Sequence, residues 1–169
     1  MTKPKTSSLT VSRLREVLEY NPETGLWTWL STLSIRRVSG SQAGELKKNG
    51  YIFIGIDCER YRAHRLAWFY VYGKWPQYQI DHINGNRSDN RLVNLRLATN
   101  KENSTNRDKN RNNTSGFKGV FWNKRSKKWT AKINNGSKQI HLGNFYDPLD
   151  AHNAYIKASK TLFGDFGRG

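Results

Sequence analysis

Cysteine is nearly absent from this chain, because Cys58 is the only one among its 169 residues. An internal disulfide is therefore impossible, and so is a zinc site built from several cysteines. We expect no structural zinc, and any bound metal would have to take oxygen and nitrogen ligands.

Long apolar runs are missing as well. None approaches the roughly 20 residues that a membrane-spanning helix needs. The first ten residues, MTKPKTSSLT, lack the apolar centre of a signal peptide. The sequence therefore predicts an intracellular protein that is not secreted and has no membrane partner.

Acidic residues are scarce, with 13 Asp and Glu against 29 Lys and Arg, which gives a formal net charge of +16. The surplus is denser towards the C-terminus, with +9 over residues 107–169 and +7 over residues 1–106. Such a charge favours a polyanionic partner, and nucleic acid fits better than a membrane. Apolar residues make up 36% of the chain, which is enough for folded domains.

Hydrophobic patterning predicts an α+β fold in which the first part of the chain ends in the order strand, loop, strand, helix. Gly73 should end a helix, and Thr99-Asn100-Lys101-Glu102 matches a capping box that begins another. The predicted segments are a helix from Thr10, strands at Leu26–Leu30 and Tyr51–Asp57, a helix at Ala63–Tyr72, strands at Tyr78–Ile83 and Asn94–Ala98, and a helix from Thr99.

A stretch without apolar side chains, NRDKNRNNTSG at residues 106–116, interrupts these patterns. It predicts a first domain over residues 1–106, a basic linker over 107–115 and a second domain over 116–169. The second domain should be a three-stranded antiparallel sheet packed on one helix that begins after Asp147-Pro148. Its predicted strands are Lys118–Trp122, Lys128–Ile133 and Lys138–Leu142.

The segment from Ile80 to Asn106 holds the residue types that phosphodiester hydrolysis needs. This reaction requires a base that deprotonates water and a cation that neutralises the charge developing on the phosphate. His82 has a suitable ordinary pKa for the base, and Asp81, on the other strand face, can ligate metal. Asp81 and Asn103 offer only two oxygen ligands, which suits Mg²⁺ because this ion keeps several waters.

Short motifs occur around these residues at fixed spacings: His64-Arg65-Leu66, Asp81-His82-Ile83-Asn84-Gly85-Asn86, Asn90-Arg91, Asn94-Leu95-Arg96 and Glu102-Asn103. Together they resemble the HNH homing endonucleases common in phages. The resemblance implies a ββα-metal unit in which His82 is the general base and Asp81 and Asn103 bind Mg²⁺, with Mn²⁺ as an alternative. It also implies that Asn94 steadies the loop and the His82 ring. A phage-encoded protein of this kind would act in the cytoplasm of a bacterial host.

Other interpretations of these residues stay open. An isolated Asp-His pair is usually structural, so the nuclease hypothesis depends on the joint pattern. A degenerate HNH fold kept for binding, or an unrelated fold, is the alternative. His64 and Arg65 are better explained as a packed, hydrogen-bonded pair than as catalytic residues, and Arg96 could contact DNA phosphate.

The C-terminal part carries Gly116-Phe117-Lys118-Gly119-Val120, Lys128 to Ile133, His141-Leu142-Gly143-Asn144-Phe145, and Ala151 through Tyr155 to Phe163-Gly164. Over roughly residues 114–165 it resembles the DNA-binding domain of plant ethylene-response factors of the apetala-two type. The resemblance implies a three-stranded sheet that lies in the major groove with a helix behind it. Phe121, Asn123 and His141 depart from the plant pattern, so base preference cannot be transferred.

Alternation along the second strand of this part favours apolar side chains towards the helix and basic side chains outward. The inward set is Trp129, Ala131 and Ile133, and the outward set is Lys128, Thr130 and Lys132. Core positions are also the simplest explanation of Trp129 and Tyr155, whereas the role of Trp122 stays open.

The residues that we expect to contact DNA come mostly from this outer face and its first turn. The basic cluster at the turn could be a merely solvated hairpin tip, but the neighbouring Trp122 favours phosphate contact. The full set is Arg96, Arg107, Lys118, Trp122, Lys124, Arg125, Lys128, Lys132, Lys138 and Gln139.

The sequence thus predicts a metal-dependent HNH endonuclease that hydrolyses phosphodiester bonds of double-stranded DNA. One active site per chain should nick one strand and leave 5′-phosphate and 3′-hydroxyl ends, with monomer or homodimer left open. The alternative is a non-catalytic, sequence-specific DNA-binding regulator that needs neither metal nor His82. RNA as the substrate is a third hypothesis.

Overall fold

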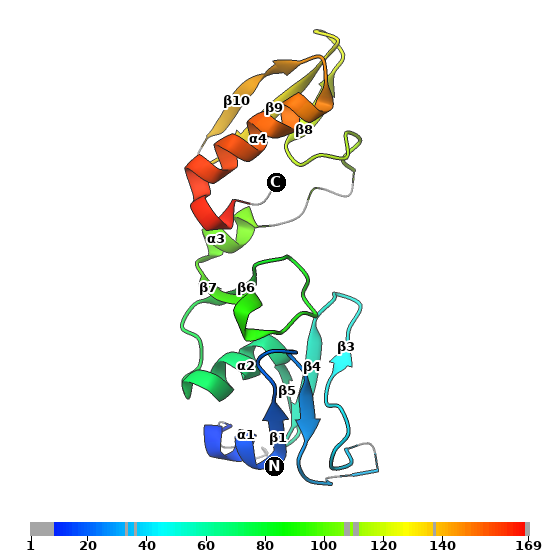
Figure 1. Cartoon of the computed structure of the whole chain (residues 1–169), viewed down its shortest axis with the longest axis vertical. Helices are drawn as coiled ribbons and strands as arrows, with labels where there is room; N and C mark the ends of the chain where they lie inside the picture. The colour runs from blue at the N-terminus through cyan, green and yellow to red at the C-terminus, as the bar shows by residue number, and fades with distance from the viewer. Residues whose placement is uncertain are drawn as a thin grey trace, which may run out of the picture. The chain divides into compact units, whose positions relative to one another are not determined.

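The computed structural model describes residues 9–32, 34–35, 37–106, 109, 112–136 and 138–167. The chain divides into two compact units, Met1–Leu97 and Ala98–Gly169, and each contains helices and small sheets (Figure 1). The α+β class is as predicted. Among the described helices, none has the length and apolar character that crossing a membrane requires.

The first unit begins with helix α1 (Val11–Val17), whose N-cap Thr10 accepts a hydrogen bond from the Arg13 backbone. The chain then becomes extended at Leu18 (φ −139°), and strand β1 (Leu18–Tyr20) pairs antiparallel with β2 (Trp27–Trp29). Strand β1 was not predicted from the sequence, because Leu18 continues the helical spacing of the apolar residues before it.

A three-stranded antiparallel sheet follows, with β4 (Ile52–Ile56) between β3 (Glu45–Leu46) and β5 (Glu59–Arg62). The turn between β4 and β5 places Asp57 and Cys58 at positive φ of 46° and 67°. Helix α2 (Ala63–Tyr72) comes next and ends, as predicted, at Gly73 in the left-handed conformation.

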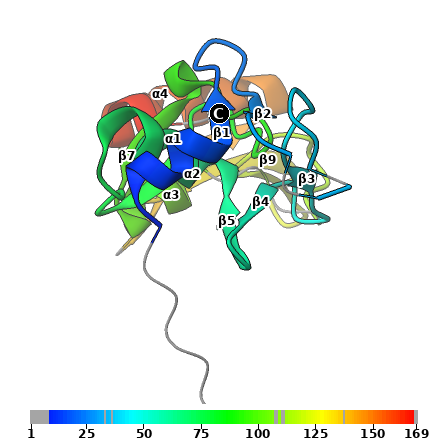
Figure 2. The same ribbon diagram turned by 90° about the horizontal axis from the view of Figure 1, so that it is seen from below.

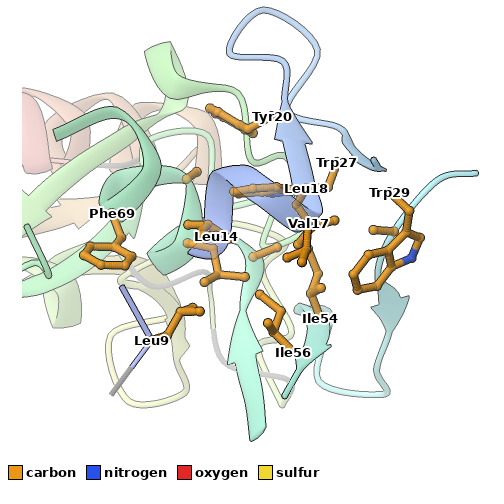
Figure 3. Close-up of a cluster of buried hydrophobic side chains, with 14 of the residues drawn as sticks. Leu9, Leu14, Val17, Leu18, Tyr20, Trp27, Trp29, Ile54, Ile56 and Phe69 are labelled. Carbon is orange, nitrogen blue, oxygen red and sulfur yellow. The ribbon is translucent and has the colours of Figure 1, made fainter. Parts of the chain in front are cut away.

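The core of the first unit joins these elements. Figure 3 shows Leu14 from α1 and Leu18 from β1 beside Ile54 and Ile56 from β4, and all four side chains are at most 1% exposed. Helix α2 contributes Leu66 to the same cluster and lies beside α1 (Figure 2). Burial of each of these side chains stabilises the folded state by about 1.5–3 kcal/mol. The packing of this cluster therefore fixes the position of α2 in the first unit.

The last elements of the first unit are β6 (Gln79–His82) and the short 3₁₀ helix η1 (Leu92–Asn94), which leads into β7 (Leu95–Ala98). Strands β6 and β7 are hydrogen-bonded neighbours in a two-stranded sheet. The Ile83 amide donates to the Asn94 carbonyl at 2.9 Å, which closes the loop between them. The predicted strand, loop and strand are therefore present.

The second unit opens with α3 (Asn100–Thr105), where Thr99 and Glu102 form the predicted capping box. Its sheet has the order β10-β9-β8, from β8 (Val120–Asn123), β9 (Lys128–Asn134) and β10 (Gln139–Phe145). Helix α4 (Pro148–Phe163) lies across one face of this sheet and is followed by the 3₁₀ helix η2 (Gly164–Phe166) (Figure 1). Asp147 caps α4, as predicted.

Packing in the second unit follows the predicted alternation with one exception. Ala131 and Ile133 are buried, Trp129 packs against the core, and Tyr155 is only 6% exposed. Thr130 was expected to face solvent, but it is 1% exposed, because its hydroxyl donates to Asn144 Oδ1 at 2.6 Å on the adjacent strand. The predicted domain boundary at residue 106 stays a prediction.

Candidate active site

The predicted base and metal ligand both end strand β6. Asp81 is 5% exposed and His82 is 4% exposed. Adjacent side chains on a strand point to opposite faces, so each can have its own surroundings. The loop of residues 83–91 begins directly after them, and its conformation therefore decides what surrounds the His82 ring.

Asn94 holds this loop. Its Oδ1 accepts from the Asn84 backbone amide at 2.9 Å, and its Nδ2 donates to Asn84 Oδ1 at 3.0 Å and to the Asp89 carbonyl at 2.9 Å. The side chain of Asp89 in turn accepts bonds from Asn84 and Arg91. These bonds, with Arg91 first, lower the pKa of Asp89 to about 2. Asn94 is thus placed as a loop-steadying residue requires, while its part in catalysis stays a prediction.

Asn90 contacts the His82 ring, a role that was not predicted from the sequence. It is 1% exposed, and its Oδ1 lies 3.4 Å from His82 Nε2. Its Nδ2 donates to the Ser88 carbonyl at 3.2 Å, which orients Oδ1 towards the ring as an acceptor. His82 should therefore carry its proton on Nε2, which makes Nδ1 the basic nitrogen of the neutral ring.

The hairpin of β1 and β2 holds Asn90 and the residues that follow it through hydrogen bonds. The Tyr20 hydroxyl donates to the Asn90 carbonyl at 2.7 Å, and the Leu92 amide donates to the Pro22 carbonyl at 3.0 Å. Gly25, at φ +72°, approaches so closely that a Cβ there would lie 2.4 Å from the Arg91 nitrogen. Residues about 70 positions apart in sequence thereby fix the loop that contacts His82.

Burial favours the neutral form of the His82 ring. Desolvation lowers the pKa of His82 and the charge of Arg87 acts in the same direction, while the Asn90 hydrogen bond and the carboxylates of Asp81 and Asp89 raise it. His64 packs edge-on against His82 with ring centroids 5.0 Å apart, and burial followed by the neighbouring His82 lowers the pKa of His64 to about 3. His64 is packed as expected, but its buried Nδ1 has no hydrogen-bond partner among the described residues, contrary to the hydrogen bonding expected of it.

Asp81 forms an ion pair with Arg96, which was expected to contact DNA. Both Nε and a terminal nitrogen of Arg96 donate to Asp81 Oδ2, at 2.9 and 2.8 Å. The pairing offsets the cost of burying the carboxylate. Whether Arg96 also contacts DNA stays a prediction.

The residues fit a hard divalent cation through their donor chemistry. Asp81 supplies a buried carboxylate in the first unit, whereas Asn103 lies on α3 in the second unit, so joint metal binding by these two residues stays a prediction. No group of three His, Cys, Asp or Glu side chains gathers in the described part of the chain. A cation held by Asp81 and an amide oxygen would keep most of its ligands as water, which Mg²⁺ tolerates.

The predicted DNA contacts of the second unit are mostly exposed. Trp122 is 43% exposed and stands edge-on to Trp129. The ammonium groups of two lysines lie over aromatic rings, that of Lys132 over Phe121 and that of Lys128 over Tyr146. Lys118 is partly buried and donates to the Thr105 carbonyl, whereas Lys124, Arg125, Lys138 and Gln139 are exposed. Arg107 lies outside the described residues.

Comparison of the sequence with known proteins identifies a family. Residues 61–105, from β5 to the end of α3, match the HNH endonuclease family. The chain is 38% identical over 108 residues to Protein 3.8 of Escherichia phage T7. The aligned region covers 63% of this chain and 88% of that protein. The chain belongs to the HNH endonuclease family. No solved structure matches it significantly.

Membership of the HNH endonuclease family implies a nuclease with DNA as its substrate, and HNH nucleases generally use divalent metal ions. The matched residues include the β6 end, the 83–91 loop and α3. The comparisons give no support to the ethylene-response-factor resemblance of the C-terminal part, so that assignment stays a prediction.

Proposed function

We propose that this HNH family member hydrolyses phosphodiester bonds of double-stranded DNA, with His82 as the general base. The observation that carries this proposal is the buried His82 ring, tied through Nε2 to Asn90 beside the carboxylate of Asp81. A neutral imidazole with a fixed tautomer can accept a proton from water at neutral pH.

Each residue has a separate task in this proposal. His82 Nδ1 takes the proton of the attacking water, while Asn90 prevents the ring from turning. Asn94 keeps the loop in place, and Asp81 with Asn103 would hold the divalent cation, Mg²⁺ or Mn²⁺. When bound, such a cation neutralises charge that develops on the phosphate. The products would carry 5′-phosphate and 3′-hydroxyl ends.

The second unit would anchor the chain on duplex DNA through its basic sheet. Lys128 and Lys132 lie on the face opposite α4, and the exposed Lys124 and Arg125 sit in the adjoining turn. A sheet of this size can enter the major groove. A chain with one active site would nick a single strand, as a monomer or as one half of a homodimer, inside the cell that contains the DNA.

The competing function is a DNA-binding regulator that retains the fold without cutting. It is favoured by the Arg96–Asp81 ion pair, which could have replaced a metal. Conversion of supercoiled plasmid to nicked circle with Mg²⁺ or Mn²⁺, with and without EDTA, separates the two. The nuclease predicts metal-dependent nicking that His82→Ala abolishes; DNA binding without cutting by either protein would support the regulator.

A further inference from the structure

Two arginines converge on one tyrosine in the first unit. The guanidinium carbons of Arg62 and Arg87 each lie 5.0 Å from the centroid of the Tyr51 ring. Arg62 ends strand β5, Arg87 belongs to the 83–91 loop, and Tyr51 precedes β4. Arg87 is held further by a bond from its side chain to the Asn49 carbonyl at 3.0 Å. Three segments thus place two positive charges on one ring.

The same tyrosine touches the candidate active site. Its ring centroid lies 6.0 Å from that of His82 and 5.2 Å from that of His64. The two guanidiniums therefore flank the ring that borders the proposed base. A phosphate group placed near them would belong to the same stretch of DNA backbone as a phosphodiester at His82.

Neither arginine is neutralised by an acidic side chain of the described residues. Both side chains are exposed, and among the described residues neither has a carboxylate partner, in contrast to Arg91 and Arg96. Arg62 is also the N-cap of α2, and the first turn of that ten-residue helix contains no acidic residue. The positive end of the helix therefore adds to the charge of the pair instead of being neutralised.

We propose that Arg62 and Arg87, held by Tyr51, bind backbone phosphates of DNA next to the phosphodiester attacked at His82. The planar guanidinium can donate two parallel hydrogen bonds to one phosphate. The Tyr51 ring restricts both side chains before binding, so less conformational entropy is lost when they bind. The site rests on the proposed nuclease function for its orientation, but binding by these arginines can be measured without cleavage.

Binding of a labelled duplex by the full-length chain, measured by fluorescence anisotropy in EDTA over a series of KCl concentrations, tests this proposal. For each phosphate that a variant no longer neutralises, the slope of log K against log [KCl] should fall by about 0.9. Arg62→Gln and Arg87→Gln should each lower the slope by this amount and weaken binding by roughly tenfold at low salt. Arg37→Gln is the matched control, since its guanidinium lies over Trp29 instead of Tyr51.

Two Tyr51 variants test the role of the ring. Tyr51→Phe keeps the aromatic face and should bind as the wild type does, whereas Tyr51→Leu should weaken binding as the arginine variants do. Thermal unfolding monitored by circular dichroism identifies any variant that fails to fold. Slopes for Arg62→Gln and Arg87→Gln equal to those of the wild type and of Arg37→Gln would overturn the proposal.

Cleavage separates this proposal from the nuclease function. If the wild type nicks DNA, one phosphate beside the cut can be replaced by an uncharged methylphosphonate. This replacement should lower the nicking rate of the wild type. It should not lower that of the Arg87→Gln or Arg62→Gln protein, which no longer binds the phosphate at that position. If the wild type cuts no DNA, the nuclease function fails, while the salt slopes still decide whether these arginines bind phosphate.

Discussion

Replacement of Asn90 by alanine tests whether this buried amide orients the His82 imidazole, the proposed general base. The variant removes the acceptor 3.4 Å from His82 Nε2 and the donor to the Ser88 carbonyl. Ser88 is partly exposed, so water can replace its partner, but His82 is 4% exposed. An unsatisfied buried donor costs about 1–3 kcal/mol, which is less than the stability of a typical domain. The variant should therefore fold.

The expected effect on cleavage is larger than that on folding. General-base catalysis supplies about 10²–10⁴-fold of rate, and this is the most that loss of orientation can remove. Because His82 itself remains in the Asn90→Ala protein, we expect a decrease of roughly 10–100-fold in the rate of nicking. The decrease should appear in the rate constant at saturating protein and leave DNA affinity within about twofold, because Asn90 is 1% exposed.

The assay is single-turnover nicking of supercoiled plasmid with protein in excess and Mg²⁺ present. Asn134→Ala is the control, because that asparagine caps an exposed turn in the second unit, where it accepts from the Gly136 amide. A folded Asn90→Ala protein that nicks as fast as the Asn134→Ala protein would show that Asn90 does not orient His82.

Two further predictions concern the support of the loop. Gly25→Ala places a Cβ 2.4 Å from the Arg91 nitrogen at a φ of +72°, so it should lower the thermal midpoint and the nicking rate together, whereas Gly40→Ala, with nothing within 4 Å, should lower neither as much. The folded-state pKa of Asp89 is depressed to about 2, so its contribution to stability is present above its unfolded value near 4 and is lost as pH falls through about 2. Urea unfolding across that interval should show a smaller loss for Asp89→Asn than for the wild type.

Local signals in the sequence predicted several elements correctly. Gly73 ended α2, Asp147 with the following proline began α4, and Thr99 with Glu102 began α3, because capping and left-handed conformations depend on neighbouring residues alone. Strand β5 was missed because three of the residues in Glu59–Arg62 are charged, and Tyr61 alone gives no apolar alternation. It is a strand because the tight turn before it brings it back against β4.

The candidate site likewise contains residues that local sequence signals indicate and residues whose contacts depend on distant segments. Asp81 and His82 could be selected as candidates from residue types and spacing, and they lie at the end of a largely buried strand, while their catalytic roles stay predictions. The role of Asn90 could not be identified, since its contact with His82 depends on a loop that Tyr20 and Gly25 hold from a distant hairpin. One signal was available: an Asn among polar loop residues, within a motif of fixed spacing, that is not needed for any turn.

The Arg96–Asp81 ion pair links two roles that the sequence analysis treated separately. A buried carboxylate needs a cationic partner, and the Arg96 side chain is 16% exposed, so its guanidinium is partly withdrawn from solvent. An arginine that donates two bonds to a carboxylate can offer fewer to a phosphate and contributes less to DNA binding than an exposed one. Arg62 and Arg87 are exposed and lack carboxylate partners within the described residues. Phosphate binding beside His82 should therefore depend on them more than on Arg96, whose first task is to hold Asp81.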